Sequence, residues 1–290
     1  MLAFRRWFRQ SGVMIMKSYN NQDVLLKAIQ ACRLGREILL KHYGHLEHVE
    51  EKLHAGLVSE ADKASEEVIK KQLQKFFPES EFLGEEESYL TGTKVGSPAL
   101  TKPRWILDPL DGTTNYVHRF PIFCISLGLE FQGQIQIAVI DVPMLNETYT
   151  AIRGGGAYLN GKPIKVSQTK ELKNSLLATG FFADESGALE EQLKIFSNLV
   201  RVSRGIRRAG AAAYDLCMVA RGVFDAFWER NLSPWDTAAG LLLVQEAGGQ
   251  VVTYRGKSYD PYKNAIMATN GFLTSTLVQS VSTMLSEETH

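Results

Sequence analysis

The sequence predicts a mixed fold in which an α+β half is followed by an α/β half, with a soft boundary near residue 170. Between residues 105 and 152, apolar runs of strand length follow one another along the chain. After about Lys170, strand-like runs instead alternate with helix-length stretches. The length of 290 residues and the 44% apolar content suit one large domain or two coupled subdomains with a buried core.

The first half is expected to begin with two helices. Apolar and small residues recur at helical spacing from 21 to 43, and a second such stretch runs from 64 to 77 before Pro78 ends it. Residues 88–103 are rich in turn formers and predict an exposed loop. The expected strands then cover 105–107, 122–131, 135–142 and 148–152. Tight turns are predicted at Gln132-Gly133 and Asn160-Gly161.

The second half is expected to alternate strands with helices. The predicted strands cover 176–179, 223–228, 250–254 and 265–268, and the predicted helices cover 189–200, 211–221, 236–247 and 271–285. No long linker separates the halves, so a site is expected between them.

The charge balance excludes two classes of protein. With 32 Lys plus Arg against 32 Asp plus Glu, the chain is neither a polybasic nucleic-acid binder nor an acidic disordered protein. No apolar run approaches the roughly 18 residues that a membrane helix needs, so no membrane partner is expected. Residues 1–20 are basic and aromatic; they could form an amphipathic anchor, but a simple N-terminal extension is the favoured interpretation.

The three scattered cysteines are expected to be free thiols in a reducing, cytoplasmic compartment: Cys32, Cys124 and Cys217.

The segment D-P-L-D-G-T-T-N carries the strongest chemical signal. An apolar strand delivers Asp108 to its end, and Pro109 is expected to stop the strand there. Asp111 follows three residues later, with Gly112 allowing a sharp bend. Two carboxylates with the Leu110 carbonyl between them favour a hard cation, Mg²⁺ or Mn²⁺. The alternative, a turn in which the aspartates cap backbone groups, would suffice for one aspartate but not for this combination.

Three further acidic residues stand where strands end or helices begin, and each has an ordinary structural interpretation. Asp62 in GLVSEAD forms a capping signature with Ser59. Asp236 in SPWDTAAG could be an ordinary N-cap. Glu85 belongs to the G-E-E triplet, a type common on surfaces, and its neighbour Glu87 is expected to be solvated. Taken alone, Asp62 and Asp236 fit a cap better than a ligand.

The combination of FLGEEE, WILDPLDGTTNYVHRFP and PWDTAAG, in this order, resembles the inositol monophosphatase family of magnesium-dependent, lithium-sensitive phosphatases. The resemblance covers nearly the whole chain from about residue 21. It implies the layered αβαβα sugar-phosphatase fold and a homodimer. The α+β half at 21–170 would then be a metal-binding subdomain, and the α/β half at 171–290 would complete the site. It implies two or three Mg²⁺ ions, with Mn²⁺ possible. The implied ligands are Glu85, Asp108, the Leu110 carbonyl, Asp111 and Asp236, with Asp62 acting through metal-bound water.

The resemblance also implies how a substrate would lie. The Gly112 and Thr113 amides would bind phosphate oxygens, and Asp236 would also face the substrate. Gly210, Ala211 and Ala212 would lie against the sugar ring, where small residues allow a close approach. Glu229 would bond ring hydroxyls; its alternative is an ordinary rim charge. Departures from the family pattern at Gly56 and around Gly180 leave the ring specificity open.

The expected activity is a Mg²⁺-dependent phosphomonoesterase acting on inositol 1-phosphate or a similar small-molecule phosphomonoester. Glu85 and Thr113 would hold an attacking water, and Asp111 would be essential. One alternative is a broader sugar phosphatase that includes fructose 1,6-bisphosphate. An alternative of another class is a regulatory interaction protein that reuses the fold.

Three other patterns receive ordinary interpretations. The spacing of His42, His45 and His48 drifts around a helix, so these side chains are expected to be solvated. The run at 154–156 lacks the features of a phosphate-binding loop and predicts a turn. Arg207 and Arg208 fit a phosphate contact and a surface charge pair equally well.

Overall fold

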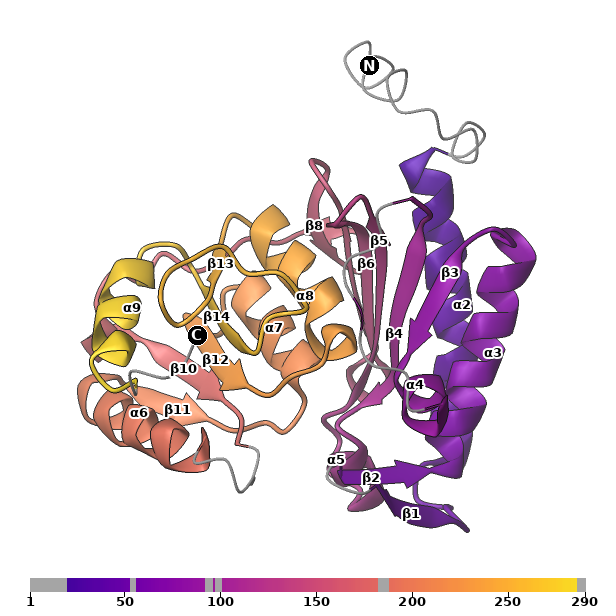
Figure 1. The fold of residues 1–290 in the computed structure, drawn as a ribbon, viewed down its shortest axis with the longest axis horizontal. Helices are drawn as coiled ribbons and strands as arrows, with labels where there is room; N and C mark the ends of the chain where they lie inside the picture. Colours follow the sequence, from indigo (N-terminus) through magenta and orange to yellow (C-terminus); the bar gives the residue numbers. More distant parts are fainter. Residues whose placement is uncertain (1–19, 53–55, 92–95, 97–100, 182–187, 286–290) are drawn as a thin grey trace.

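The protein consists of five layers in the order αβαβα (Figure 1). The computed structural model describes residues 20–285, apart from 53–55, 92–95, 97–100 and 182–187. A seven-stranded sheet and a five-stranded sheet enclose a central pair of helices, and a further helix pair covers the outer face of each sheet. This confirms the predicted fold class. The predicted extension at 1–20 lies outside the described residues except for its last residue.

The two helices on the outer face of the larger sheet are α2 (Asn21–His42) and α3 (Glu60–Phe76). α2 begins where the Asn20 side chain accepts a hydrogen bond from the Asp23 amide, and it buries the predicted apolar face. α3 begins four residues before the predicted start at 64, because Ser59 and Asp62 form a complete capping box. The short strands β1 (Val49–Lys52) and β2 (Gly56–Ser59) pair with each other and were not predicted.

The seven-stranded sheet follows chain order from β3 to β9. Its strands are β3 (Glu81–Gly84), β4 (Arg104–Asp111), β5 (Cys124–Phe131), β6 (Gln134–Val142), β7 (Glu147–Ile152), β8 (Gly156–Leu159) and β9 (Lys162–Pro163). β3 runs parallel to β4 and every other pair is antiparallel. Both predicted turns are present, with positive φ at Gln132-Gly133 and at Asn160-Gly161. The predicted loop from 88 is wrong at its start, since α4 (Glu85–Thr91) continues to residue 91; most of the remainder lies outside the described residues.

The prediction that Pro109 stops its strand is wrong. β4 continues to Asp111, with a register shift against β5 between Asp108 and Asp111. Proline lacks an amide hydrogen, and a bulge leaves a backbone position unpaired, so this residue is tolerated there. Gly112 then takes a φ of +91° and starts the short helix α5 (Thr113–Val117). The bulge therefore places two aspartates at the end of β4, the second strand of the sheet.

The five-stranded sheet has the order β11, β10, β12, β14, β13. These strands are β10 (Leu176–Thr179), β11 (Gly205–Arg207), β12 (Ala226–Arg230), β13 (Gln250–Val252) and β14 (Ala265–Thr269). α6 (Ala188–Val202) and α9 (Thr274–Ser282) cover its outer face. The predicted strand at 223–228 begins three residues late, because residues 223–225 form a bend before β12. The unpredicted β11 is only three residues long.

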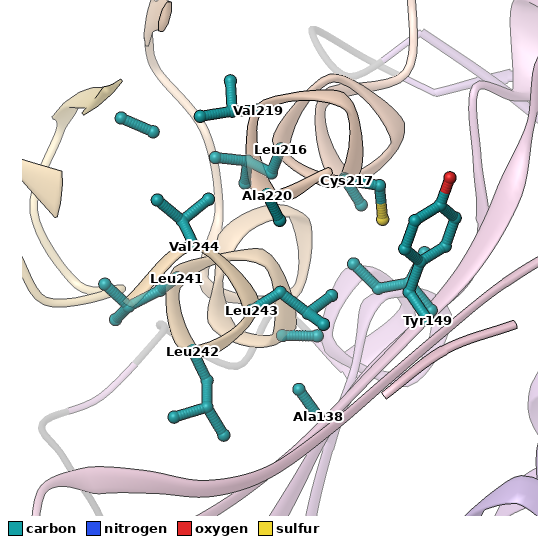
Figure 2. Close-up of a cluster of buried hydrophobic side chains, with 14 of the residues drawn as sticks. Ala138, Tyr149, Leu216, Cys217, Val219, Ala220, Leu241, Leu242, Leu243 and Val244 are labelled. Atoms are coloured by element: carbon teal, nitrogen blue, oxygen red, sulfur yellow. The ribbon is translucent and has the colours of Figure 1, made fainter. Parts of the chain in front are cut away.

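The central layer consists of α7 (Ala212–Ala220) and α8 (Pro234–Glu246). Their apolar side chains form a continuous core with residues of both sheets. Figure 2 shows this packing against Ala138 and Tyr149 of the larger sheet. α8 is apolar on nearly all sides, as expected for a helix enclosed by sheets. Gly240 allows it to approach Leu216 of α7, because a Cβ there would overlap this leucine. The two helices of the central layer therefore pack closely against each other.

The two sheets meet in this shared layer. The larger sheet ends at Pro163 and the smaller one begins at Leu176. The subdomain division at residue 170 stays a prediction. None of the described helices is long and apolar enough to cross a membrane.

Candidate active site

Four segments bring acidic residues together where β4 meets the central helices. Asp62 lies in the first turn of α3, Glu85 begins α4, Asp108 and Asp111 end β4, and Asp236 lies in the first turn of α8. Burial raises the pKa values of Asp62, Asp108 and Asp236, and the nearby charge of Glu85 raises each of them further. All five predicted carboxylates therefore belong to one electrostatic cluster, drawn from both halves of the chain.

Asp108 and Asp111 are both held by backbone amides. Asp108 is 2% exposed and accepts a hydrogen bond of 2.9 Å from the Leu110 amide, so the turn interpretation describes a real contact. Asp111 is 8% exposed and accepts hydrogen bonds from the amides of Ala212 (3.2 Å) and Ala213 (2.7 Å) at the start of α7. Asp111 thus joins the end of β4 to the central layer.

Three aspartates of the acidic cluster have no ion-pair partner in the described part of the chain. No lysine or arginine there forms an ion pair with Asp108, Asp111 or Asp236. Burial raises the pKa of Asp111 to about 6, above its ordinary value of 3.8. Burial, and then the charges of Glu85 and Asp111, raise the pKa of Asp108 and of Asp236. Unpaired buried carboxylates are costly, so the cluster is suited to a cation.

The capping interpretations of Asp62 and Asp236 are confirmed in a modified form. Each is the third helical residue of a capping box, with Ser59 and Ser233 as the N-caps, so the interpretation of Asp236 as the N-cap itself is wrong. The Ser59 amide donates to Asp62 Oδ2 at 2.8 Å, and the Ser233 amide donates to Asp236 Oδ2 at 2.6 Å. In each carboxylate this bond occupies Oδ2, so capping leaves Oδ1 available to other groups.

The Thr113 hydroxyl connects Asp62 to the β4 bulge. Its Oγ1 lies 3.0 Å from Asp62 Oδ1 and 3.1 Å from the Leu110 carbonyl oxygen, either of which can accept its proton. Burial raises the pKa of Asp62 to about 6, while its bonds from Ser59 favour the ionised form. The hydroxyl proton is thus directed into the protein, and the oxygen lone pairs are free to accept a hydrogen bond.

A cavity of about 110 Å³ adjoins the cluster. Asp111 lines it, and so do five of the seven residues expected to contact substrate: Gly210, Ala211, Ala212, Glu229 and Asp236. Gly112 and Thr113 are not in the lining. A Cβ on Gly112 would lie 3.2 Å from the Ala211 side chain and 3.3 Å from the Gly210 carbonyl oxygen, so the glycine turn packs directly behind the cavity wall.

Glu229 faces this cavity and is packed against Gly180. Burial, and then the charge of Asp111, raise the pKa of Glu229 to about 8, although Arg208 opposes the shift. A Cβ on Gly180 would overlap the Glu229 carboxylate. The absence of a side chain at Gly180 therefore allows Glu229 to occupy its position.

Replacing Gly180 with alanine is expected to displace the Glu229 carboxylate and lower the free energy of unfolding by about 1–3 kcal/mol, the usual cost of overpacking. Thermal and urea unfolding measure this effect. Gly205→Ala is the matched control, because a Cβ there meets its neighbours at ordinary contact distances of 3.4 and 3.8 Å. Equal stability of the two variants would contradict the close packing of Glu229.

Asn115, the last residue of the D-P-L-D-G-T-T-N segment, donates from Nδ2 to the Ala209 carbonyl (2.8 Å) and so ties α5 to the loop that forms the cavity wall. Two further contributors to the site lay outside the sequence interpretation. Cys124 Sγ lies 3.5 Å from Asp111 Oδ2, a contact that cross-strand pairing in the bulge creates. Asp215 lines the cavity three residues after Ala212. The helical spacing of Asp215 from Ala212 was the available signal for it.

The remaining patterns agree with their ordinary interpretations, with two exceptions. His45 and His48 are exposed as predicted, whereas His42 is half-buried and its Nδ1 lies 3.0 Å from the Ile38 carbonyl of its own helix. The amides of Gly154 and Gly156 bind the Glu246 side chain in a turn. Arg208 lines the cavity, and its guanidinium donates to the Phe181 carbonyl, whereas Arg207 does not line it. In the described part of the chain, no three His, Cys, Asp or Glu side chains already stand in a metal-holding arrangement, so the ligand set stays a prediction.

Comparison with known proteins decides the family. A sequence model described as the inositol monophosphatase family matches residues 20–286. The chain belongs to the inositol monophosphatase family. It is 42% identical to Nus factor SuhB of Pseudomonas aeruginosa (86% of this chain, 92% of the relative) and 39% identical to inositol monophosphatase 3 of Solanum lycopersicum (88% and 94%). The crystal structure of extragenic suppressor protein suhB from Bartonella henselae matches with a TM-score of 0.81 and 37% identity, over 89% of this chain and 98% of that one.

Family membership identifies the chain as a phosphatase of a metal-dependent family that acts on small-molecule phosphomonoesters. The matched residues span both halves of the chain, and every carboxylate of the acidic cluster lies within them. The relatives carry different names, a Nus factor and an inositol monophosphatase, so the family match does not by itself select a substrate.

Proposed function

We propose that this protein is a Mg²⁺-dependent phosphomonoesterase that hydrolyses inositol 1-phosphate or a closely similar cyclic polyol phosphate. One observation carries the proposal: carboxylates from four segments, of which Asp62, Asp108 and Asp111 are buried, gather beside a small cavity lined by small residues and by Glu229. The first feature suits hard cations, and the second suits a compact ligand rich in hydroxyl groups.

Oxygen ligands from both halves would hold the metal ions. We assign this role to Glu85, Asp108, the Leu110 carbonyl, Asp111 and Asp236, with Asp62 acting indirectly. An all-oxygen donor set favours two or three Mg²⁺ ions, or Mn²⁺, over zinc. When bound, such ions neutralise the phosphate dianion and lower the pKa of water toward neutrality.

The protein's own groups would orient the attacking water. The Thr113 hydroxyl lies within hydrogen-bonding distance of Asp62 and Leu110, which accept its proton, and its lone pairs can therefore accept a hydrogen bond from water. Glu85, on the neighbouring α4, would accept the second hydrogen bond. Two acceptors fix the direction of a water lone pair, which favours in-line attack on phosphorus.

The cavity would hold the leaving group. The small residues Gly210, Ala211 and Ala212 allow a ring to approach the backbone, and Glu229 would accept hydrogen bonds from ring hydroxyls. The Gly112 and Thr113 amides would bind phosphate oxygens, and Asp236 would face both the metal ions and the substrate.

A second candidate function is favoured by the relative named Nus factor SuhB, which supports a regulatory interaction role for the same fold. This role is compatible with catalysis. Within the enzyme class, the second candidate is a broader sugar phosphatase whose substrates include fructose 1,6-bisphosphate.

The buried free thiols Cys32, Cys124 and Cys217 support a reducing, cytoplasmic location. The homodimer proposal rests on family membership.

Phosphate release from a substrate panel tests the proposal. The panel contains inositol 1-phosphate, fructose 1,6-bisphosphate and p-nitrophenyl phosphate, each with Mg²⁺, with Mg²⁺ plus Li⁺, and with chelator. We expect Mg²⁺-dependent turnover with the highest kcat/KM for inositol 1-phosphate. A preference for the bisphosphate would replace the inositol assignment, and Mg²⁺-independent turnover would contradict the metal assignment.

A further inference from the structure

Asp215 is a buried carboxylate in the cavity, and one of its oxygens has no hydrogen-bond partner among the described residues. It lies on α7, is 1% exposed, and lines the cavity beside Glu229 and Arg208. Within the described residues, no donor reaches its fully buried Oδ1. Buried polar atoms in native proteins nearly always have a partner, so this oxygen requires an explanation.

The surroundings make the position of Asp215 unfavourable for stability alone. Burial, and then the charges of Glu229 and Asp111, raise its pKa well above the ordinary value, and only Arg208 acts in the opposite direction. Among the described residues, Arg208 forms no ion pair with Asp215; its guanidinium contacts the Phe181 carbonyl. The carboxyl thus lies near two other acids, and no lysine or arginine of the described residues forms an ion pair with it.

Helix capping does not account for this side chain. The N-cap of α7 is Ala211, which makes no side-chain cap bond, and Asp215 is the fourth residue inside the helix. The first two amides of the helix, those of Ala212 and Ala213, are already bound by Asp111. A side chain that neither caps its helix nor forms an ion pair, but lines a cavity, is placed to bind a ligand.

We propose that Asp215 is a specificity-determining residue that forms a hydrogen bond with a second hydroxyl of the substrate ring, in addition to the hydroxyl bound by Glu229. The inference rests on the proposed function and deepens it. Two carboxyl groups from different layers, α7 and β12, would then read two ring hydroxyls. The cavity would select cyclic polyol phosphates over phosphomonoesters without hydroxyls, because an unmatched ligand leaves a buried carboxyl unsatisfied.

The test compares Asp215→Leu, which removes both oxygens at similar volume, with Asp215→Asn, which keeps a hydrogen-bonding group. For Asp215→Leu, kcat/KM for inositol 1-phosphate is expected to fall about 10- to 100-fold, as for loss of a buried hydrogen bond. The same constant for p-nitrophenyl phosphate should change by less than about 2-fold, because that substrate has no hydroxyl to bind. Asp215→Asn should recover most of the loss. Met218→Leu, a volume-conserving change on the same helix outside the cavity lining, is the control and should alter neither constant.

Equal losses for both substrates in Asp215→Leu would overturn the inference, because they indicate a structural role, and so would no loss for either. Failure of the proposed function gives a different result: the wild-type protein would release no phosphate from any substrate. In that case, the binding of inositol 1-phosphate, measured by calorimetry, tests the role of Asp215 independently of turnover. Weaker binding to Asp215→Leu than to wild type supports it, and equal binding or no binding overturns it.

Discussion

Replacing Asp111 with asparagine is expected to reduce phosphatase kcat by at least about 10²-fold, the range observed when one preorganised electrostatic contact is removed. Asp111 ends β4, reaches the first amides of α7, and belongs to the cluster proposed to hold the metal ions. Asparagine has nearly the same shape but lacks the charge that balances a cation. Steady-state phosphate release at saturating Mg²⁺ measures the effect.

The fold of this variant should survive, because the change removes one unpaired buried charge while keeping one amide acceptor. Asp141→Asn is a matched control: Asp141 is a fully buried aspartate of β6 that pairs with Arg36 instead of belonging to the acidic cluster. That control should retain turnover and lose stability. A near wild-type rate for Asp111→Asn would refute the assignment, and retention of biological function without turnover would favour the regulatory role.

Without divalent metal, the protein is expected to become less stable as the pH rises from 5 to 8, and Mg²⁺ should restore stability most strongly at pH 8. Burial raises the pKa values of Asp62 and Asp111 from 3.8 to about 6 and that of Glu229 from 4.5 to about 8. The folded state therefore binds more protons than the unfolded state between these values, and the free energy of unfolding falls as those protons are lost.

The shift of Asp62 alone corresponds to about 3 kcal/mol, at about 1.4 kcal/mol for each pKa unit. Mg²⁺ at 100 times its Kd would add about 2.7 kcal/mol, which corresponds to a rise in Tm of about 5 °C or more. Thermal unfolding at pH 5, 6.5 and 8, with Mg²⁺ or with chelator and K⁺ at matched ionic strength, measures both effects. A chelated protein whose Tm rises from pH 5 to pH 8 would show that the carboxylates have cation partners in the protein.

Local sequence signals predicted the long elements well. The helical spacing around Val24 to Leu39 predicted α2 nearly to its ends, and the apolar runs predicted β5 and β6 within two residues. The Asn160-Gly161 turn depends on backbone conformations that few other residues adopt, and it was predicted from two letters. The short strands β1 and β11 escaped prediction because their residues, V-E-E-K and G-I-R, form no apolar run, whereas the equally short β10, L-L-A-T, was predicted at its exact bounds.

Two of the errors concern the segments that carry the acidic residues. Pro109 did not end β4, because a bulge accepts a residue without an amide hydrogen, and a bulge depends on the partner strand. Asp236 is the third residue of its capping box instead of the N-cap, since Ser233 takes that position. In both cases the outcome depended on a neighbouring residue or strand and not on the residue type alone.

The sequence by itself determined the layered fold class, the family resemblance and the identity of the five clustered carboxylates, because periodicity and motif order are local properties of the chain. Only the tertiary structure decided which groups share one small volume: the Asp111 bond to α7, the room that Gly180 leaves for Glu229, and the unpartnered oxygen of Asp215. Burial and the loss of hydrogen-bond partners arise when segments distant in sequence pack together, and these effects create the charged, desolvated site.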